Sequence, residues 1–333
     1  MTIKLGVIGT GHLGKFHVKL SKLLKDGELV GIYDQNKEQA AKICEEFGTT
    51  SFDDINELIK KVDAVIIVAT TSAHYEVCKM ALEAGKHVFV EKPITSTIQE
   101  AEEIVAIAKK MNLKLQVGHI ERFNPALVSL EKYNLEPKFI QTDRLAQFNP
   151  RGTDVAVVLD LMIHDIDIIL SLVKSEVKDI MASGIAVVSD SIDIANARIE
   201  FENGAVANVT ASRISQKKMR KMRMFQRDTY LALDFNTGES EVFRLTDPEK
   251  NISESFFALG EMGVGDKKKL LVYEQPQKLE LNAMQHELQL FVNAIVNDEE
   301  PVVTGNDGLR ALKIADIILK KIEESAKKIK SEA

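Results

Sequence analysis

The sequence predicts an α/β protein in which a parallel-sheet domain precedes an α+β domain with a large open antiparallel sheet. From residue 4 to residue 119, short runs rich in β-branched residues alternate with amphipathic stretches, a pattern typical of βαβ units. After residue 119 the pattern changes to strand-like runs separated by turn residues. We therefore expect one domain over residues 1–119 and a second over residues 120–333, with the last helix free to pack back on the first domain.

The composition is that of an ordinary globular protein. The chain has 333 residues, of which 45% are hydrophobic, and its 43 basic and 50 acidic residues give a net charge of −7. This charge offers no general attraction for nucleic acid or for a membrane surface. Two cysteines, Cys44 and Cys78, are too few for a disulfide framework or a structural zinc site. We expect a cytoplasmic protein with no metal site, no nucleic-acid partner and no membrane span.

Five apolar runs of the first domain are expected to form parallel strands that are covered on both faces. They are "KLGVIG", "LVGIYD", "AVIIVAT", "HVFVEKP" and "KLQVGH", which begin at residues 4, 29, 64, 87 and 114. Sheets of this kind bind ligands at the carboxyl ends of their strands. Thr97 and Glu100 have the spacing of a capping box, which predicts the start of a helix that runs towards Met111.

The second domain is expected to combine one strongly apolar helix, over residues 155–173, with antiparallel strands. The runs "ANARIEF", "AVANVTASR" and "TYLALDF" alternate like half-buried strands, and Asn203-Gly204 and Thr237-Gly238 mark turns. Residues 281–325 return to helical periodicity.

Residues 6–20, "GVIGTGHLGKFHVKL", place three glycines between a predicted strand and a predicted helix. The helix is indicated by the spacing of Leu13, Phe16, Leu20, Leu23 and Leu24. In a dinucleotide-binding unit, Gly9 permits the tight turn, Gly11 lets the backbone approach a pyrophosphate, and Gly14 lets helix and strand pack closely. The free N–H groups at the start of the helix favour the same anion. The alternative is that the glycines serve only a tight turn.

Asp34 ends the second predicted strand, twenty positions after Gly14. A carboxylate there can accept hydrogen bonds from the adenosine ribose hydroxyls, and it repels a 2′-phosphate. Gln35 and Asn36 follow it, and neither supplies the positive charge that a phosphate would need. The sequence therefore predicts a Rossmann domain that binds NAD in preference to NADP.

Two groups of residues are candidates for the chemistry. Lys92 stands at the carboxyl end of a predicted strand, where it could meet a ligand or simply extend into solvent. In "VVLDLMIHDIDIILSLV", Asp160, His164 and Asp167 fall at i, i+4 and i+7 and form one polar stripe on an apolar helix. The stripe could be a thin solvent-facing edge, but a carboxylate beside a histidine on a mostly buried helix favours a functional role.

Four stretches, "GVIGTGHLG", "HVFVEKP", "GHIERFNPA" and "LDLMIHDID", together resemble the glucose-fructose oxidoreductase, inositol dehydrogenase and MocA family (Gfo/Idh/MocA) along essentially the whole chain. The resemblance implies a Rossmann domain, an open-faced antiparallel sheet domain and an active site between them. The Glu-Lys-Pro motif of the family matches Glu91, Lys92 and Pro93, and its Asp-x-x-x-His motif matches Asp160 and His164.

The resemblance also implies roles for the matching residues. His164 would take the proton of a substrate hydroxyl and Lys92 would hold that oxygen, although the two could share the role of base. Asp160 would orient His164 or bind a neighbouring hydroxyl. The expected cofactor contacts are Gly9, Thr10, Gly11, His12, Leu13, Gly14, Asp34, Thr70, His74, Glu91 and Lys92, with Glu91 at the nicotinamide ribose. One departure is Thr70-Thr71, where a Thr-Pro pair is common, so the contacts around His74 are less well defined.

Within the family, "ERFNPA" and "PRGTDVAVVLDLMIHDID" are most similar to UDP-N-acetylglucosamine 3-dehydrogenases. Independently, "KKMRKMRMFQR", residues 217–227, is the one dense basic segment of an acidic chain, and a diphosphate needs cationic donors. The alternative is a strand whose charges simply face water. The expected substrate contacts are Arg122, Asp160, Lys218 and Arg220.

The sequence thus predicts an NAD-dependent oxidoreductase that oxidises a secondary hydroxyl of a sugar, with the 3-hydroxyl of UDP-N-acetylglucosamine or a related nucleotide-sugar as the first candidate. One alternative is a dehydrogenase of another sugar or of inositol. The other is a catalytically silent NAD-bound sensor, against which the presence of both Lys92 and His164 argues. We expect a homodimer or homotetramer that assembles through the sheet of the second domain.

Overall fold

The computed structural model describes residues 1–149, 155–247 and 256–332. The first five residues of "PRGTDVAVVLDLMIHDID" therefore lie outside the described residues. The chain forms two compact units: Met1–Phe123 with Asn282–Lys313, and Asn124–Leu281 with Ile314–Ala333. The first unit thus takes a segment from the distant carboxyl-terminal part of the chain, whereas the sequence placed its boundary after residue 119.

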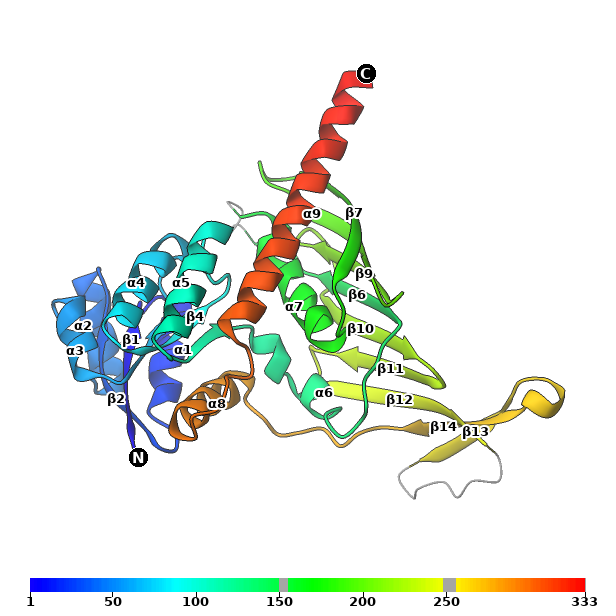
Figure 1. Cartoon of the computed structure of the whole chain (residues 1–333), viewed down its shortest axis with the longest axis horizontal. Coiled ribbons are helices and arrows are strands. Elements are labelled where there is room, and N and C mark those ends of the chain that lie inside the picture. The colour runs from blue at the N-terminus through cyan, green and yellow to red at the C-terminus, as the bar shows by residue number, and fades with distance from the viewer. Residues whose placement is uncertain (150–154, 248–255, 333) are drawn as a thin grey trace. The chain divides into compact units, whose positions relative to one another are not determined.

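A five-stranded parallel sheet of order β2-β1-β3-β4-β5 forms the centre of the first unit (Figure 1). Its strands are β1 (Ile3–Ile8), β2 (Gly27–Tyr33), β3 (Ala64–Ile67), β4 (His87–Glu91) and β5 (Leu115–Gly118). All its strand pairs are parallel, which confirms the predicted Rossmann-like sheet. The strand order reverses beside β1, the position at which doubly wound sheets bind ligands.

Helices cover both faces of this sheet. They are α1 (His12–Ser21), α2 (Lys37–Phe47), α3 (Ile55–Lys61), α4 (Thr71–Glu83), α5 (Ile98–Lys110) and the late helix α8 (Ala283–Val296). On one face, Leu5 of β1 belongs to the same core as Val18 of α1 and Phe291 of α8. On the other face, a Cβ at Gly6 would lie 3.0 Å from Leu58 of α3. This double coverage explains why the strands are continuous apolar runs.

The helix starts and ends test two local predictions. Thr97 and Glu100 form the complete capping box at the start of α5, as predicted. The prediction for α1 was partly wrong, because the helix ends at Ser21, before Leu23, and Phe16 is exposed. The buried residues of α1 are Gly14, His17, Val18, Leu20 and Ser21. A Cβ at Gly14 would lie 2.1 Å from the carbonyl oxygen of Gly9, which directly follows β1.

The second unit contains a nine-stranded sheet of order β13-β14-β12-β11-β10-β6-β9-β8-β7. The strands are β6 (Phe139–Leu145), β7 (Val177–Ile185), β8 (Ile194–Phe201), β9 (Val206–Ser212), β10 (Met219–Gln226), β11 (Thr229–Asp234), β12 (Glu239–Thr246), β13 (Phe257–Met262) and β14 (Lys269–Glu274). Neighbouring strands are antiparallel except β6 and β9, which run parallel. The predicted turns hold, since Gly204 and Gly238 have φ values of +80° and +71°.

The predicted apolar helix of the second unit has two parts. It opens with a π-helical segment η2 (Val158–Met162) and continues as α7 (Ile163–Leu172). The remaining helical segments are η1 (Ile120–Phe123), α6 (Pro125–Val128), η3 (Gly265–Lys267) and α9 (Gly305–Glu332). Along the described part of the chain, no helix combines the length and apolar character needed to cross a membrane.

Candidate functional site

The residues predicted for the site fall into two groups, one in each unit. The residues in the first unit are Gly9, Thr10, Gly11, His12, Leu13, Gly14, Asp34, Thr70, His74, Glu91, Lys92 and Arg122. The second unit holds Asp160, His164, Lys218 and Arg220.

The three glycines of the loop between β1 and α1 differ in what a side chain at each position would meet. Gly9 has φ +90°, and a Cβ there would lie 2.7 Å from the backbone nitrogen of Ala69. A Cβ at Gly14 would lie 2.1 Å from the Gly9 carbonyl oxygen, so α1 can cross the end of β1 only with a glycine. A Cβ at Gly11 would meet no atom within 4 Å, and no side chain caps the helix there. Open space beside an uncapped helix start fits a pyrophosphate.

Asp34 is fixed against the glycine loop. The backbone N–H and the hydroxyl of Thr10 both donate to Asp34 Oδ2 at 2.7 Å, and Asn36 N–H donates to Oδ1 at 2.8 Å. Gln39 in turn donates to the Thr10 carbonyl oxygen at 2.9 Å. An ionised carboxylate offers about four lone-pair positions, so Asp34 can still accept from a ribose hydroxyl. This geometry is compatible with the predicted contact between Asp34 and the adenosine ribose.

Three further candidates for cofactor contacts are exposed. His12 packs edge-on against Phe16 with ring centroids 5.7 Å apart, and Leu13 is beside it at the start of α1. Thr70 precedes α4, and its hydroxyl lies 3.2 Å from that of Ser72. All three side chains are accessible to a ligand, and their contacts with the cofactor stay predictions.

His74 is placed differently from an exposed ligand contact, because its side chain is almost completely buried. Its Nδ1 lies 2.9 Å from the Pro93 carbonyl oxygen and its Nε2 lies 3.1 Å from that of Ala69. Burial lowers the pKa of the imidazole, against the opposing effect of the two carbonyl contacts. His74 joins the loop after β3 to the loop after β4, so the geometry favours a positioning role.

Glu91 and Lys92 follow one another at the carboxyl end of β4, and both are half-buried. Glu91 Oε1 lies 2.8 Å from His17 Nε2, and Oε2 accepts a hydrogen bond from the Lys92 backbone N–H at 3.2 Å. Burial raises the pKa of Glu91, but the His17 hydrogen bond and the charges of His17 and Lys92 outweigh it and hold the pKa below its ordinary value. Glu91 is therefore an ionised acceptor at neutral pH.

Arg122, a predicted substrate contact, lies in η1. Its side chain is largely buried, and its Nη2 is 3.6 Å from Asp307 Oδ1 within the same unit. The Asp307 carboxylate also accepts from the N–H and the hydroxyl of Thr304 at the start of α9. Arg122 thus contributes to holding the carboxyl-terminal segment in the first unit, and its contact with substrate stays a prediction.

The polar stripe of the second unit is not a continuous solvent-facing edge. Asp160 and His164 are half-buried, whereas Asp167 is only 1% exposed. Asp160 lies in the π-helical segment η2, and His164 lies in the α-helix that follows it. Asp165, beside His164, is buried and accepts from Arg144 Nε and Nη2 of β6, each at 2.9 Å. This bidentate pair fixes α7 on the sheet.

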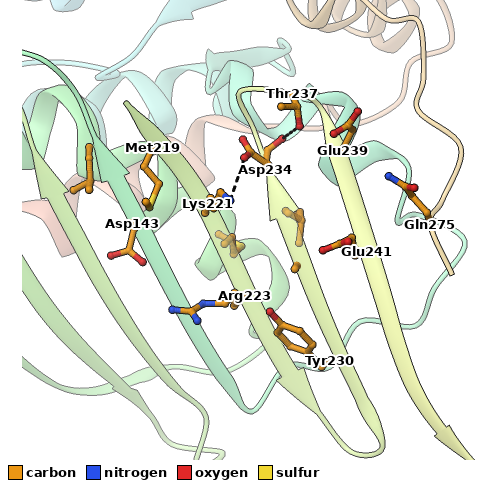
Figure 2. A pocket seen from close by; sticks show the side chains of 14 residues that line it. Asp143, Met219, Lys221, Arg223, Tyr230, Asp234, Thr237, Glu239, Glu241 and Gln275 are labelled. Carbon is orange, nitrogen blue, oxygen red and sulfur yellow. Dashed lines mark hydrogen bonds and ion pairs between the residues drawn. The ribbon is translucent and has the colours of Figure 1, made fainter. Parts of the chain in front are cut away.

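The basic side chains of β10 lie on both faces of the sheet, because side chains alternate between the two faces along a strand. Arg220 pairs across strands with Arg144, so it lies on the sheet face that holds α7, whereas Lys218 precedes the strand. Lys221 and Arg223 lie on the opposite face and line a polar cavity of about 710 Å³ (Figure 2). There Lys221 Nζ is 3.5 Å from Asp234, beside Glu241 and Tyr230. The segment is therefore not a single binding surface.

Sequence reasoning missed two residues that hold the candidates in place, His17 and Arg144. His17 precedes its partner Glu91 by 74 positions, and Arg144 precedes Asp165 by 21. The available signal was weak: His17 is three residues after Gly14, on the helix face that Gly14 brings against the sheet. Arg144 is a charged residue in an alternating strand, at a position that faces the core.

Two family models match the chain. The oxidoreductase family with an NAD-binding Rossmann fold (GFO_IDH_MocA) matches residues 3–119. The GFO/IDH/MocA C-terminal domain matches residues 133–228.

Individual relatives and structures agree with these matches. UDP-N-acetylglucosamine 3-dehydrogenase of Acidithiobacillus ferrooxidans is 41% identical over 234 residues, which cover 70% of this chain and 74% of that protein. Myo-inositol 2-dehydrogenase of Thermotoga maritima is 26% identical over 342 residues, with 97% of each chain covered. The solved structure of the A. ferrooxidans enzyme, GnnA, superposes with a TM-score of 0.86 and 33% identity, covering 97% of this chain and 99% of that one.

Proposed function

Because the chain belongs to the Gfo/Idh/MocA oxidoreductase family, we propose that it oxidises the 3-hydroxyl of UDP-N-acetylglucosamine or of a related nucleotide-sugar with NAD. The two relatives described above are dehydrogenases. The observation that carries this proposal is the likeness, in sequence and in fold, to the A. ferrooxidans enzyme. The more distant myo-inositol 2-dehydrogenase supports the coarser assignment, a dehydrogenase that acts on a secondary hydroxyl.

The first unit has the features that NAD requires. The open space at Gly11 and the start of α1 would receive the pyrophosphate, and Asp34 would accept from the adenosine ribose. The Asp34 carboxylate would repel the 2′-phosphate of NADP. Glu91 would accept from the nicotinamide ribose. Bound NAD would supply the hydride acceptor for the substrate carbon.

The proposed proton chemistry belongs to Lys92, His164 and Asp160. His164 would take the proton of the substrate hydroxyl, and the Lys92 ammonium would donate a hydrogen bond to the same oxygen, which gains negative charge as its proton leaves and becomes the carbonyl oxygen as the carbon gives up its hydride. Asp160 orients His164 or binds a neighbouring hydroxyl. The buried pair of Arg144 and Asp165 supports this role, because it holds the helix that carries His164.

The proposed diphosphate contacts are Lys218 and Arg220. Both side chains are exposed, and the pairing of Arg220 with Arg144 places it on the face of the sheet that holds α7. Guanidinium and ammonium groups are the usual partners of phosphate oxygens. Arg122 would contribute to the same substrate.

We also propose a cytoplasmic homodimer or homotetramer that assembles through the nine-stranded sheet. Its face opposite α7 carries a row of neighbouring aromatic rings, in which Phe225, Tyr230 and Phe243 stack and Tyr273 lies tilted against Phe243. Partly exposed aromatic rows of this kind are favoured in protein interfaces. The two cysteines form no disulfide, which suits a reducing compartment.

NADH formation measured at 340 nm tests the proposed function. The purified protein is given NAD and, in parallel, UDP-N-acetylglucosamine, UDP-glucose and myo-inositol, and the oxidised product is analysed by NMR to identify the carbon. We expect the largest kcat/KM for UDP-N-acetylglucosamine, with a ketone at C3. A larger value for myo-inositol would select the inositol alternative, and binding of NAD without turnover of any of these compounds would favour a sensor.

A further inference from the structure

His17 occupies an unusual place for a histidine. Its side chain is completely buried, and its ring packs against Phe89 of β4 with centroids 5.5 Å apart. Its Nε2 lies 2.8 Å from Oε1 of Glu91, two residues further along the same strand and therefore on the same face. His17 thus contacts the end of β4 from the helix that begins at the glycine loop.

Packing alone does not explain the choice of histidine. Nδ1 of His17 has no hydrogen-bond partner among the described residues, and a buried polar atom without a partner costs stability. An aliphatic side chain would fill the site without that cost. The hydrogen bond to Glu91 is what an aliphatic side chain could not supply.

Glu91 is confined around this hydrogen bond. Its Oε2 accepts from the Lys92 backbone N–H, and Gly118 of β5 is its neighbour across the sheet. A Cβ at Gly118 would lie 2.9 Å from Oε2, so the carboxylate occupies space that any other residue there would fill. Since an ionised carboxylate only accepts hydrogen bonds, the His17 nitrogen that faces it carries the proton.

We infer that His17 is a positioning residue, which donates to Glu91 and holds that carboxylate in the orientation that accepts the nicotinamide ribose hydroxyl. The inference rests on the proposed role of Glu91 in cofactor binding. Because His17 lies on α1, the same contact sets the spacing between the glycine loop and the turn that contains Lys92.

NADH binding by the full-length protein tests the inference without any sugar substrate. The chain has no tryptophan, so the fluorescence of NADH itself can report binding without overlap from protein emission. For His17→Leu we expect the NADH dissociation constant to rise about tenfold, the effect of one well-placed hydrogen bond. His17→Gln, whose amide can donate to Glu91, should stay within about threefold of the wild type. If His17→Leu does not fold, His17→Met takes its place, because its flexible side chain fills irregular space.

Ser21→Ala is the matched control. Ser21 lies on the same buried face of α1, and its hydroxyl also lacks a partner among the described residues. This variant should leave the NADH dissociation constant unchanged. A tenfold rise in Ser21→Ala would show that any change to this face weakens binding, and it would overturn the inference.

A double-mutant cycle with Glu91→Gln separates positioning from general structural support. If His17 acts through Glu91, the double variant with His17→Leu binds NADH no more weakly than Glu91→Gln alone. The inference would be refuted if the two substitutions weakened NADH binding independently, so that their fold-changes multiplied in the double variant. Wild-type affinity for NADH in His17→Leu or in Glu91→Gln would also refute it. Failure to turn over UDP-N-acetylglucosamine would refute the proposed substrate and leave these binding results unaffected.

Discussion

Gly11 and Gly14 lie three residues apart, yet the structure requires a glycine only at Gly14. A side chain at Gly14 would collide with the carbonyl group of Gly9, whereas a side chain at Gly11 would project into open space. The fold therefore requires the glycine at Gly14, whereas the open space at Gly11 agrees with the proposed pyrophosphate contact. His74, whose ring contacts two backbone carbonyl groups, resembles Gly14 in this respect.

The two glycines give opposite predictions. Gly11→Val should abolish NADH binding and leave the melting temperature close to that of the wild type, because its Cβ meets no protein atom and the φ of −63° is allowed for any residue. Gly14→Ala should lower the free energy of unfolding by about 3 kcal/mol, as overpacking against backbone does. Thermal melting and NADH titration of both variants check this. A Gly11→Val variant that still binds NADH would contradict the assignment of the pyrophosphate site.

Asp34 is expected to decide the choice of cofactor. Replacing it with Ala removes an acceptor for the adenosine ribose and also removes the repulsion of a 2′-phosphate, so NAD should bind about tenfold more weakly while NADP loses little or nothing. Titration of both cofactors into wild-type and Asp34→Ala protein measures the change. Equal affinity of the wild type for NAD and NADP would contradict the prediction.

Lys92 and His164 should affect catalysis without affecting cofactor binding. We expect Lys92→Ala and His164→Ala each to lower kcat by about 10²- to 10⁴-fold, the usual contribution of general acid–base groups. The NADH dissociation constant should stay within about threefold of the wild type. If both variants keep full turnover, other residues must handle the substrate proton.

In strand β10, neighbouring basic side chains lie on opposite faces of the sheet. Its side chains alternate, so Arg220 shares the face of Met222, whereas Lys221 and Arg223 line the cavity on the other side. The helix that carries His164 is attached to the first of these faces through Arg144 and Asp165. A nucleotide-sugar that meets His164 would therefore meet the charges of that face only.

This alternation predicts different kinetics for two double variants. Lys218→Ala with Arg220→Ala should raise KM for UDP-N-acetylglucosamine about tenfold or more and change kcat by less than about threefold, because phosphate contacts bind ground state and transition state alike. Lys221→Ala with Arg223→Ala removes the same number of charges and should leave KM unchanged. Equal effects of the two pairs would show that net charge, and not a local contact, governs binding.

The first unit combines residues 1–123 with residues 282–313, so it contains segments from both the amino-terminal and the carboxyl-terminal parts of the chain. Leu288, Phe291 and Val292 of α8 are fully buried in the core that contains Ile3 and Leu5 of β1. Val303 also bonds to Val117 of β5 through its carbonyl oxygen. The Rossmann sheet therefore depends on residues far beyond the glycine motif.

A fragment of residues 1–123 should not fold stably by itself. It lacks the α8 side chains, each of which contributes about 1.5–3 kcal/mol by burial, and it exposes the surface that they cover. Residues 1–123 joined by a flexible linker to residues 282–313 should melt cooperatively and bind NADH. Circular dichroism melting and dye binding to exposed apolar surface compare the fragments. A cooperative transition in the shorter fragment at the same temperature would contradict this prediction.

The sequence alone determined the features that depend on local pattern. The alternation of strands and helices, the capping box at Thr97, the turns at Gly204 and Gly238 and the glycine loop with Asp34 follow from periodicity, dihedral preference and spacing within a few residues. Position and spacing also made Lys92, Asp160 and His164 candidates for the chemistry, and the family resemblance implied their individual roles.

Contacts between residues that are distant in sequence became visible in the folded chain. The contact between His17 and Glu91, the pair of Arg144 and Asp165, and the inclusion of residues 282–313 in the first unit join positions far apart in sequence. The π-helical segment before α7 and the rotation of α1 likewise depend on packing against neighbouring elements. Local periodicity carries no information about these contacts, because the burial of a side chain is set by whichever part of the chain the topology places against it.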